Sequence, residues 1–138
     1  MVDLVFKNYT SQEAPRQGFF KNILETATKE LKINVKIETS INLAGEDKMK
    51  DLNKKYRHKD MPTDVLSFPL GDGSGDIFIC LSIAKKEAKR ENIDIENKLA
   101  QLTVHGFLHL AGYDHERSKQ AEKEMLGLED KILNKINL

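Results

Sequence analysis

Hydrophobic and polar residues alternate with a period of two along residues 35–43, the pattern of a strand with one buried face. Odd-numbered positions in this segment carry Val, Ile, Thr, Ile and Leu, and even-numbered positions carry Lys, Glu, Ser and Asn. Residues 1–6 predict another strand. Between the two strands, apolar residues recur at helical spacing and predict an amphipathic helix over about 16–32. The apolar positions of that helix are Phe20, Ile23, Leu24, Ala27 and Leu31.

The next segments predict a helix followed by two short strands. Residues 46–57 form an amphipathic helix, and the apolar strands 65–70 and 76–81 come after it. Three glycines separate the two strands. A phosphate-binding loop would continue with Gly-Lys-Ser or Gly-Lys-Thr, which does not follow here, so the glycines indicate a hairpin turn. The residues of the helix that are expected to face the core are Met49, Leu52 and Tyr56.

Three helices are predicted in the C-terminal half. Ser82 caps the first, which reaches about Arg90. Asp94 begins a longer helix that ends at Gly112, a residue type favoured just after a helix C-terminus. The last helix runs from about Ser118 to the chain end. The apolar face of this last helix consists of Ala121, Met125, Leu128 and Ile132. The order of elements predicts an α+β domain with a mixed sheet.

Length and composition predict a single globular domain over residues 1–138. Lys and Arg number 22, as do Asp and Glu, so the formal charge is zero. This balance removes the simplest argument for nucleic-acid binding, a strongly basic domain. Cys80 has no partner for an intramolecular disulfide, no apolar run approaches the ~20 residues of a membrane span, and the N-terminus lacks the basic region of a signal peptide. We therefore expect a cytoplasmic protein without membrane contact.

Three of the four histidines lie within eleven residues, in the segment HGFLHLAGYDH. His105 and His109 are four residues apart on a predicted helix, so their rings leave the same face. Gly112 allows the chain to reverse, and His115 then turns back towards the first pair. Three neutral imidazoles leave a fourth position open, which is the ligand count of a catalytic zinc site.

The alternative is that these histidines are ordinary core residues of a buried helix. Burying several imidazoles, each of which needs a partner, is costly without a metal, so the metal site is favoured. An all-nitrogen donor set suits Zn²⁺ best, while Ni²⁺, Cu²⁺ and Fe²⁺ stay open.

The histidine spacing matches that of the metzincin peptidases, which predicts a zincin-like metal helix. Those enzymes place a Glu general base directly after the first histidine, where this chain has Gly106. Without that Glu, nothing there activates the zinc water, which counts against peptide hydrolysis. A glycine inside a helix costs about 1 kcal/mol relative to Ala, so position 106 indicates either the close approach of another group or tight helix packing.

These residues resemble a known family. Residues 105–115 are similar to the zinc motif of the YbeY family, bacterial endoribonucleases implicated in ribosomal RNA maturation. Residues 56–69, YRHKDMPTDVLSFP, are similar to the second motif of that family, and residues 75–77 resemble its third. Similar motifs cover about residues 53–115, and the order of elements extends the resemblance across the chain.

The resemblance implies a mixed sheet of about four strands packed with helices. It also implies that His105, His109 and His115 are zinc ligands and that Arg57 is a functional arginine near the metal cleft. The implied activity is a single-strand-type endoribonuclease in the cytoplasm, with a role in ribosome quality control. The implied partner is the ribosomal RNA of the small subunit, where the enzyme would process the 3′ end of 16S rRNA; neither DNA nor a membrane is expected.

Phosphodiester cleavage needs groups that stabilise charge and move protons. The planar guanidinium of Arg57 would hold two phosphate oxygens, or else Arg57 is a surface residue at a helix end. Asp114 either accepts an N–H from a ligand histidine or caps the turn. Glu116 and Asp64 are weaker proton-transfer candidates that we expect to be solvated, and His58 is expected at the surface. The sequence does not identify the general base.

Two segments, 48–60 and 85–90, concentrate ten basic residues. Such segments either bind RNA phosphates or form solvated helix faces. Two other functions stay open at this point. One is a metal-dependent hydrolase of peptide or amide bonds, and the other is a non-enzymatic ribosome-assembly factor with a structural metal.

Overall fold

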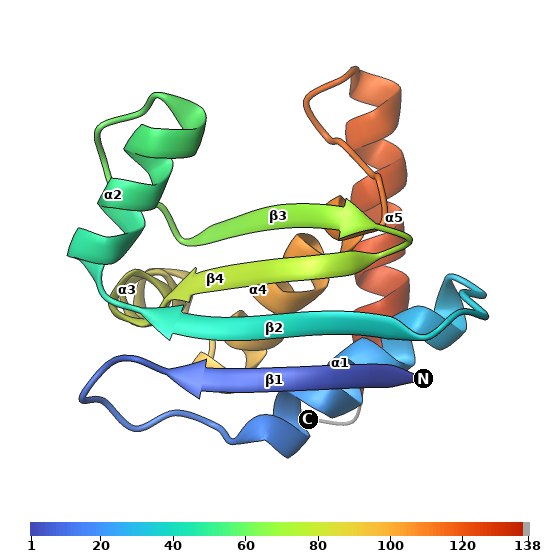
Figure 1. The fold of residues 1–138 in the computed structure, drawn as a ribbon, viewed down its shortest axis with the longest axis horizontal. Coiled ribbons are helices and arrows are strands. Elements are labelled where there is room, and N and C mark those ends of the chain that lie inside the picture. Colours follow the sequence, from blue (N-terminus) through green and yellow to red (C-terminus); the bar gives the residue numbers. More distant parts are fainter. Residues whose placement is uncertain (137–138) are drawn as a thin grey trace.

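A four-stranded mixed sheet organises the computed structural model, which describes residues 1–136 (Figure 1). The strands are β1 Val2–Asn8, β2 Ile37–Ala44, β3 Val65–Gly71 and β4 Ser74–Cys80, in the order β1-β2-β4-β3. β1 and β2 run parallel, as do β2 and β4, whereas β3 is antiparallel to β4. The predicted α+β fold with a mixed sheet of about four strands is confirmed.

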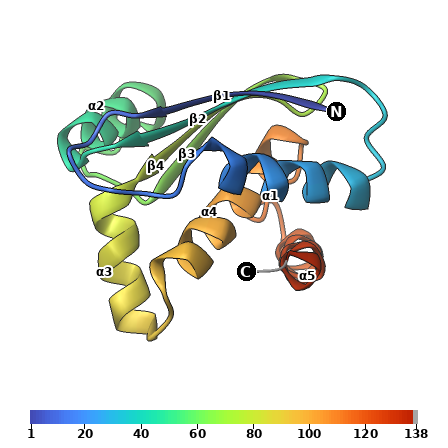
Figure 2. The same cartoon turned by 90° about the horizontal axis from the view of Figure 1, so that it is seen from below.

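Most of the helices cover one face of this sheet. α1 Gln17–Glu30, α3 Leu81–Glu91, α4 Ile95–Leu110 and α5 Lys119–Lys135 all lie on the same side (Figure 2). α2 Glu46–Arg57 instead packs on the opposite face, at one end of the sheet. No helix among the described residues has the length and apolar character needed to cross a bilayer.

α4 is the central helix, because it contacts β3, β4, α1, α3 and α5. This surrounding explains why its sequence is apolar on nearly every side. Six of its residues have no solvent exposure at all, and these are Leu99, Ala100, Thr103, Val104, Phe107 and Leu108. The predicted start of α4 is also confirmed, since the Asp94 carboxylate accepts a hydrogen bond from the Asn97 N–H at 2.8 Å.

Two sequence-based expectations about local structure were wrong. Ser82 does not cap α3, which begins one residue earlier; its hydroxyl donates instead to Glu46 Oε2 at 2.9 Å. Tyr56 does not face the core, because 53% of it is exposed at the last turn of α2. Asn53 is buried in this turn, where its side-chain amide donates to the Met61 carbonyl at 2.9 Å. The polar partner supplied by the following loop explains why an asparagine is buried there.

Gly106 lies at a close approach of α4 to the sheet. A Cβ at this position would be 3.0 Å from Ser67 Oγ, 3.1 Å from Ile77 Cγ2 and 3.3 Å from Val65 Cγ2. The Ser67 hydroxyl donates to the Gly106 carbonyl at 2.9 Å, which holds the strand against the helix. The glycine is therefore explained by tight packing of the helix on β3 and β4.

We expect Gly106→Ala to lower the free energy of unfolding by about 1 kcal/mol, because overpacking against β3 and β4 outweighs the gain in helix propensity. The matched control is Gly127→Ala in α5, where a Cβ would meet nothing within 4 Å. That control should raise the free energy of unfolding by about 0.5–1 kcal/mol. Urea unfolding measures both, and equal stabilisation by the two substitutions would contradict the packing explanation.

Candidate metal centre

The end of α4 and the turn after it bring three histidines together. His105 and His109 lie one turn apart on the helix. Gly112 has φ +100° and donates its N–H to the His109 carbonyl at 3.1 Å, so the chain reverses directly after the helix. His115 then lies against the other two rings, with centroid distances of 5.2 Å to both and 4.8 Å between His105 and His109. The predicted convergence is confirmed.

The donor atoms of this cluster fit a metal ion. One ring nitrogen from each histidine lies within 4.8 Å of the other two. The Nε2 atoms of His105 and His109 are 3.2 Å apart, close to the roughly 3.3 Å that separates two nitrogens bound to one tetrahedral Zn²⁺. His115 Nδ1 is buried and has no hydrogen-bond partner among the described residues. The three histidines are thus able to hold a metal ion.

The surroundings of His109 favour its neutral form, which is the form that binds metals. Burial lowers the pKa of His109, and the neighbouring His105 and His115 lower this pKa further. The positive charge of Arg57 acts in the same direction, whereas the negative charge of Asp114 opposes the shift.

A carboxylate from another helix holds the first histidine. Glu129 of α5 pairs through Oε1 with Nδ1 of His105. This contact directs the Nε2 lone pair of His105 into the cluster, as acidic partners of metal-binding histidines do. The sequence analysis missed Glu129. One signal was present, since Glu129 lies four residues after Met125 and three before Ile132, on the buried face of an otherwise amphipathic helix.

Asp114, which the sequence offered for the same role, caps the turn instead. Its Oδ1 accepts a hydrogen bond from the Glu116 N–H at 2.9 Å. Of the two alternatives left open for Asp114, the structure supports turn capping.

The histidines line a cavity of about 660 Å³. α2 contributes Asn53 and Arg57 to the lining, and the remaining wall comes from residues 59–67 and 112–117. Arg57 is the last residue of α2, because His58 adopts a left-handed conformation with φ 60° that ends the helix. The structure therefore brings Arg57 and the three histidines into one cleft. Arg117, which the sequence analysis did not single out, lines it too.

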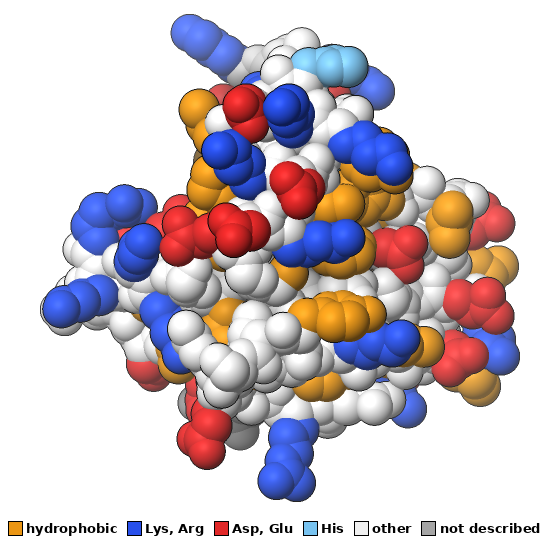
Figure 3. Space-filling model, turned by 60° about the vertical axis from the view of Figure 1, so that its left-hand side comes forward, with side chains coloured by type: hydrophobic (Ala, Val, Ile, Leu, Met, Phe, Trp, Pro, Cys, Tyr) orange, Lys and Arg blue, Asp and Glu red, His pale blue; other side chains and the backbone are white. Residues whose placement is uncertain are grey.

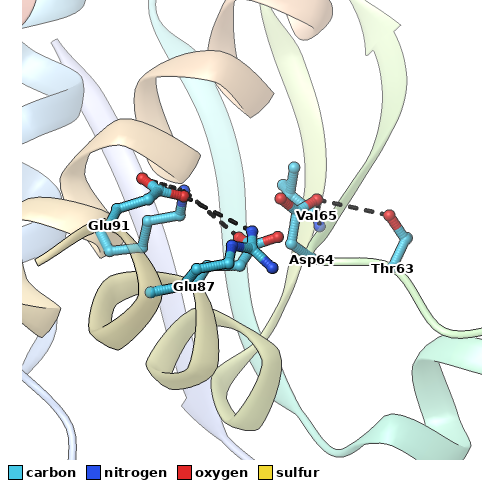
Figure 4. A network of polar contacts seen from close by, with 7 residues as sticks. Thr63, Asp64, Val65, Glu87 and Glu91 are labelled. Carbon is cyan, nitrogen blue, oxygen red and sulfur yellow. Dashed lines mark hydrogen bonds and ion pairs between the residues drawn. The ribbon is translucent and has the colours of Figure 1, made fainter.

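Asp64 lies in the same cleft but is not a freely solvated carboxylate. Its Oδ1 accepts from the Val65 N–H at 2.7 Å, and Glu87 of α3 lies behind it (Figure 4). Burial raises the pKa of Glu87, and the charge of Asp64 raises it further, while Lys98 opposes the shift. Lys98 Nζ lies 3.4 Å from Glu87 Oε1 and 2.9 Å from Glu91 Oε2. This network ties α3 and α4 to the start of β3, so Asp64 has a structural role.

Comparison with known proteins decides the family. The family model described as Endoribonuclease YbeY matches residues 5–137. The chain belongs to the YbeY family. Endoribonuclease YbeY of Sulfurihydrogenibium sp. (strain YO3AOP1) is 39% identical over 140 residues, which cover 96% of this chain and 91% of the relative. Endoribonuclease YbeY of Acholeplasma laidlawii is 42% identical over 135 residues, covering 95% and 96%.

A solved structure supports the same assignment. The solution structure of TM1509 from Thermotoga maritima is similar to this chain with a TM-score of 0.65 and 32% sequence identity. The similarity covers 96% of this chain and 87% of that protein. Membership of the YbeY family therefore extends over nearly the whole chain, including the cleft.

We expect Glu129→Gln to weaken Zn²⁺ binding by about 10- to 100-fold, because a neutral amide orients His105 less firmly and makes it a poorer donor. Competition with a chromogenic chelator measures the affinity. Glu124→Gln, an exposed position on the same helix, is the matched control and should bind Zn²⁺ like the unmodified protein. Equal affinities for the two variants would remove Glu129 from the site.

Proposed function

We propose that this protein is a zinc-dependent endoribonuclease that cleaves single-stranded segments of ribosomal RNA. The observation that carries the proposal is the meeting of three histidines and Arg57 in one cleft. The proposed biological role is maturation of the 3′ end of 16S rRNA and quality control of ribosomes in the cytoplasm. The endoribonuclease activity in this proposal is the activity for which the relatives are named.

His105, His109 and His115 would hold the ion, and their all-nitrogen donor set favours Zn²⁺ over other divalent metals. When bound, Zn²⁺ supplies Lewis acidity that polarises a phosphoryl oxygen or lowers the pKa of a water molecule. The neutral state of His109 keeps its nitrogen available as a ligand. Glu129 fixes the tautomer of His105.

Arg57 would bind the scissile phosphate. Its side chain is exposed at the end of α2 and lines the cleft with the histidines. No salt bridge to a carboxylate occupies its guanidinium among the described residues, so its donors are available to two phosphate oxygens. A guanidinium that binds two phosphate oxygens in this way positions the phosphate and stabilises the charge that develops on it during cleavage.

Peptide or amide hydrolysis is the weaker second candidate. Position 106 has no side chain and faces β3 and β4, so α4 supplies no carboxylate beside the first histidine. Asp114 is engaged in the turn and Asp64 in the network with Glu87. Glu116 also lines the cleft, with Oε1 3.9 Å from His115 Nε2, but it is exposed and does not follow the first histidine as the peptidase base does. A phosphodiester next to a ribose 2′-hydroxyl carries its own nucleophile, and such a substrate demands less of the protein.

We expect His109→Ala to reduce cleavage of a single-stranded fragment from the 3′ end of 16S rRNA by about a hundredfold or more, and chelation of the unmodified protein to do the same. Gel analysis of labelled RNA measures the rate, and re-addition of Zn²⁺ should restore only the unmodified protein. Cleavage that persists unchanged after both treatments would overturn the metal-dependent mechanism. A folded, metal-loaded protein without cleavage would instead favour an assembly factor.

We expect Arg57→Ala to lower kcat/KM by about 10- to 100-fold, the effect of losing one or two charge-assisted hydrogen bonds to a phosphate. Metal content by elemental analysis should stay unchanged, because Arg57 is not a ligand. Arg16→Ala just before α1, another exposed arginine that lies outside the cleft lining and outside the two basic segments, serves as control and should keep full activity. Unchanged kinetics for Arg57→Ala would exclude it from phosphate binding.

A further inference from the structure

Three aromatic rings form a row on the sheet face that carries α2: Tyr56 of α2, Phe68 of β3 and Phe78 of β4. The ring centroids are 5.0 Å apart for Tyr56 and Phe68 and 5.9 Å apart for Phe68 and Phe78, both in edge-to-face contact. Phe68 and Phe78 are half-buried, whereas 53% of Tyr56 is exposed. The row therefore holds the ring of Tyr56 in place at the surface without covering it.

This aromatic row adjoins the histidine cleft. Phe68 packs against the small hydrophobic cluster that includes Leu66, and Leu66 itself lines the cleft. Arg57, the neighbour of Tyr56 in the chain, lines it as well. Tyr56 is thus next in the chain to one residue of the cleft wall, and its ring contacts Phe68.

The charges around Tyr56 are mostly positive and so are complementary to the negative backbone of a nucleic acid. Lys55 Nζ lies 5.2 Å from the centroid of the Tyr56 ring. Residues 48–60 carry six basic side chains against two acidic ones, and one pair of these, Lys50 and Asp60, lies 3.8 Å apart. Hydrophobic side chains are exposed between lysine and arginine side chains on this part of the surface (Figure 3). A solvated basic helix alone would not require an exposed aromatic ring among its cations.

We propose that Tyr56 stacks on a base of single-stranded RNA whose backbone runs along the basic end of α2 into the histidine cleft. The proposal deepens the proposed function and rests on it. A stacking platform accepts any base, since every base has an aromatic face, and nearby cations bind the phosphates. The site therefore selects unpaired RNA, because a base within a duplex has no free face.

Binding of a fluorescent oligouridine of about 12 nucleotides tests this proposal. We expect Tyr56→Ala to raise Kd at least about fivefold, the lower end of what one stacked base contributes. Tyr56→Phe keeps the ring and should bind like the unmodified protein, whereas Tyr56→Leu keeps an apolar side chain without a ring and should bind like Tyr56→Ala. Tyr9→Ala is the matched control, since Tyr9 is 64% exposed beyond β1, at the opposite edge of the sheet.

An abasic oligonucleotide of the same length separates stacking from phosphate binding. With this probe, Tyr56→Ala and the unmodified protein should have equal affinities, because no base is present to stack. The stacking proposal is overturned if Tyr56→Ala binds oligouridine as tightly as the unmodified protein, or if it loses the same factor on both probes. It is also overturned if the unmodified protein does not bind oligouridine.

Failure of stacking is distinguishable from failure of the proposed function. Unchanged oligouridine affinity in Tyr56→Ala, together with RNA cleavage that depends on His109, removes only the stacking proposal. Absence of RNA cleavage by the zinc-loaded, unmodified protein removes the proposed function itself. Circular dichroism of each variant establishes that the comparison is between folded proteins.

Discussion

The close packing of α4 on β3 and β4 is the constraint on which the site depends. Gly106 permits this approach, and the hydrogen bond from Ser67 to its carbonyl maintains it. With the helix held on the sheet and covered by its neighbours, only its C-terminal turn reaches the cleft. The rings of His105 and His109 emerge there. The same glycine that allows the packing removes the position from which a zincin peptidase would supply its base.

Charged groups have different roles in different parts of the cleft. Among the histidines, burial and the neighbouring rings lower the pKa of His109, and the carboxylate of Glu129 holds His105. Farther along the cleft wall, the carboxylates of Asp64 and Glu87 lie together, and the buried Lys98 pairs with Glu87. The net charge of zero thus conceals a local excess of basic residues on α2, beside the cleft.

Sequence patterns predicted the structure correctly where the result depended on a single helix or strand. The spacing of the histidines and the position of Gly112 follow from helix geometry, and both were confirmed. Tyr56 shows the limit of this reasoning. Its helical spacing placed it with Met49 on the core side, yet the last turn of α2 extends past the edge strand β3, where no element covers it (Figure 1). Periodicity specifies a face of the helix but not how far the neighbouring sheet extends.

The sequence by itself determined the order of helices and strands, the α+β class and the three histidines, since each depends on residues close together in the chain. Only the tertiary structure decided which carboxylate holds His105, because Glu129 lies 24 residues away on another helix. It also decided that Asp64 belongs to a network with α3 and α4. The place of Arg57 beside the histidines was expected only from the family resemblance and not from any spacing along the chain. Contacts of this kind depend on how separate elements pack, and no local spacing in the sequence records that packing.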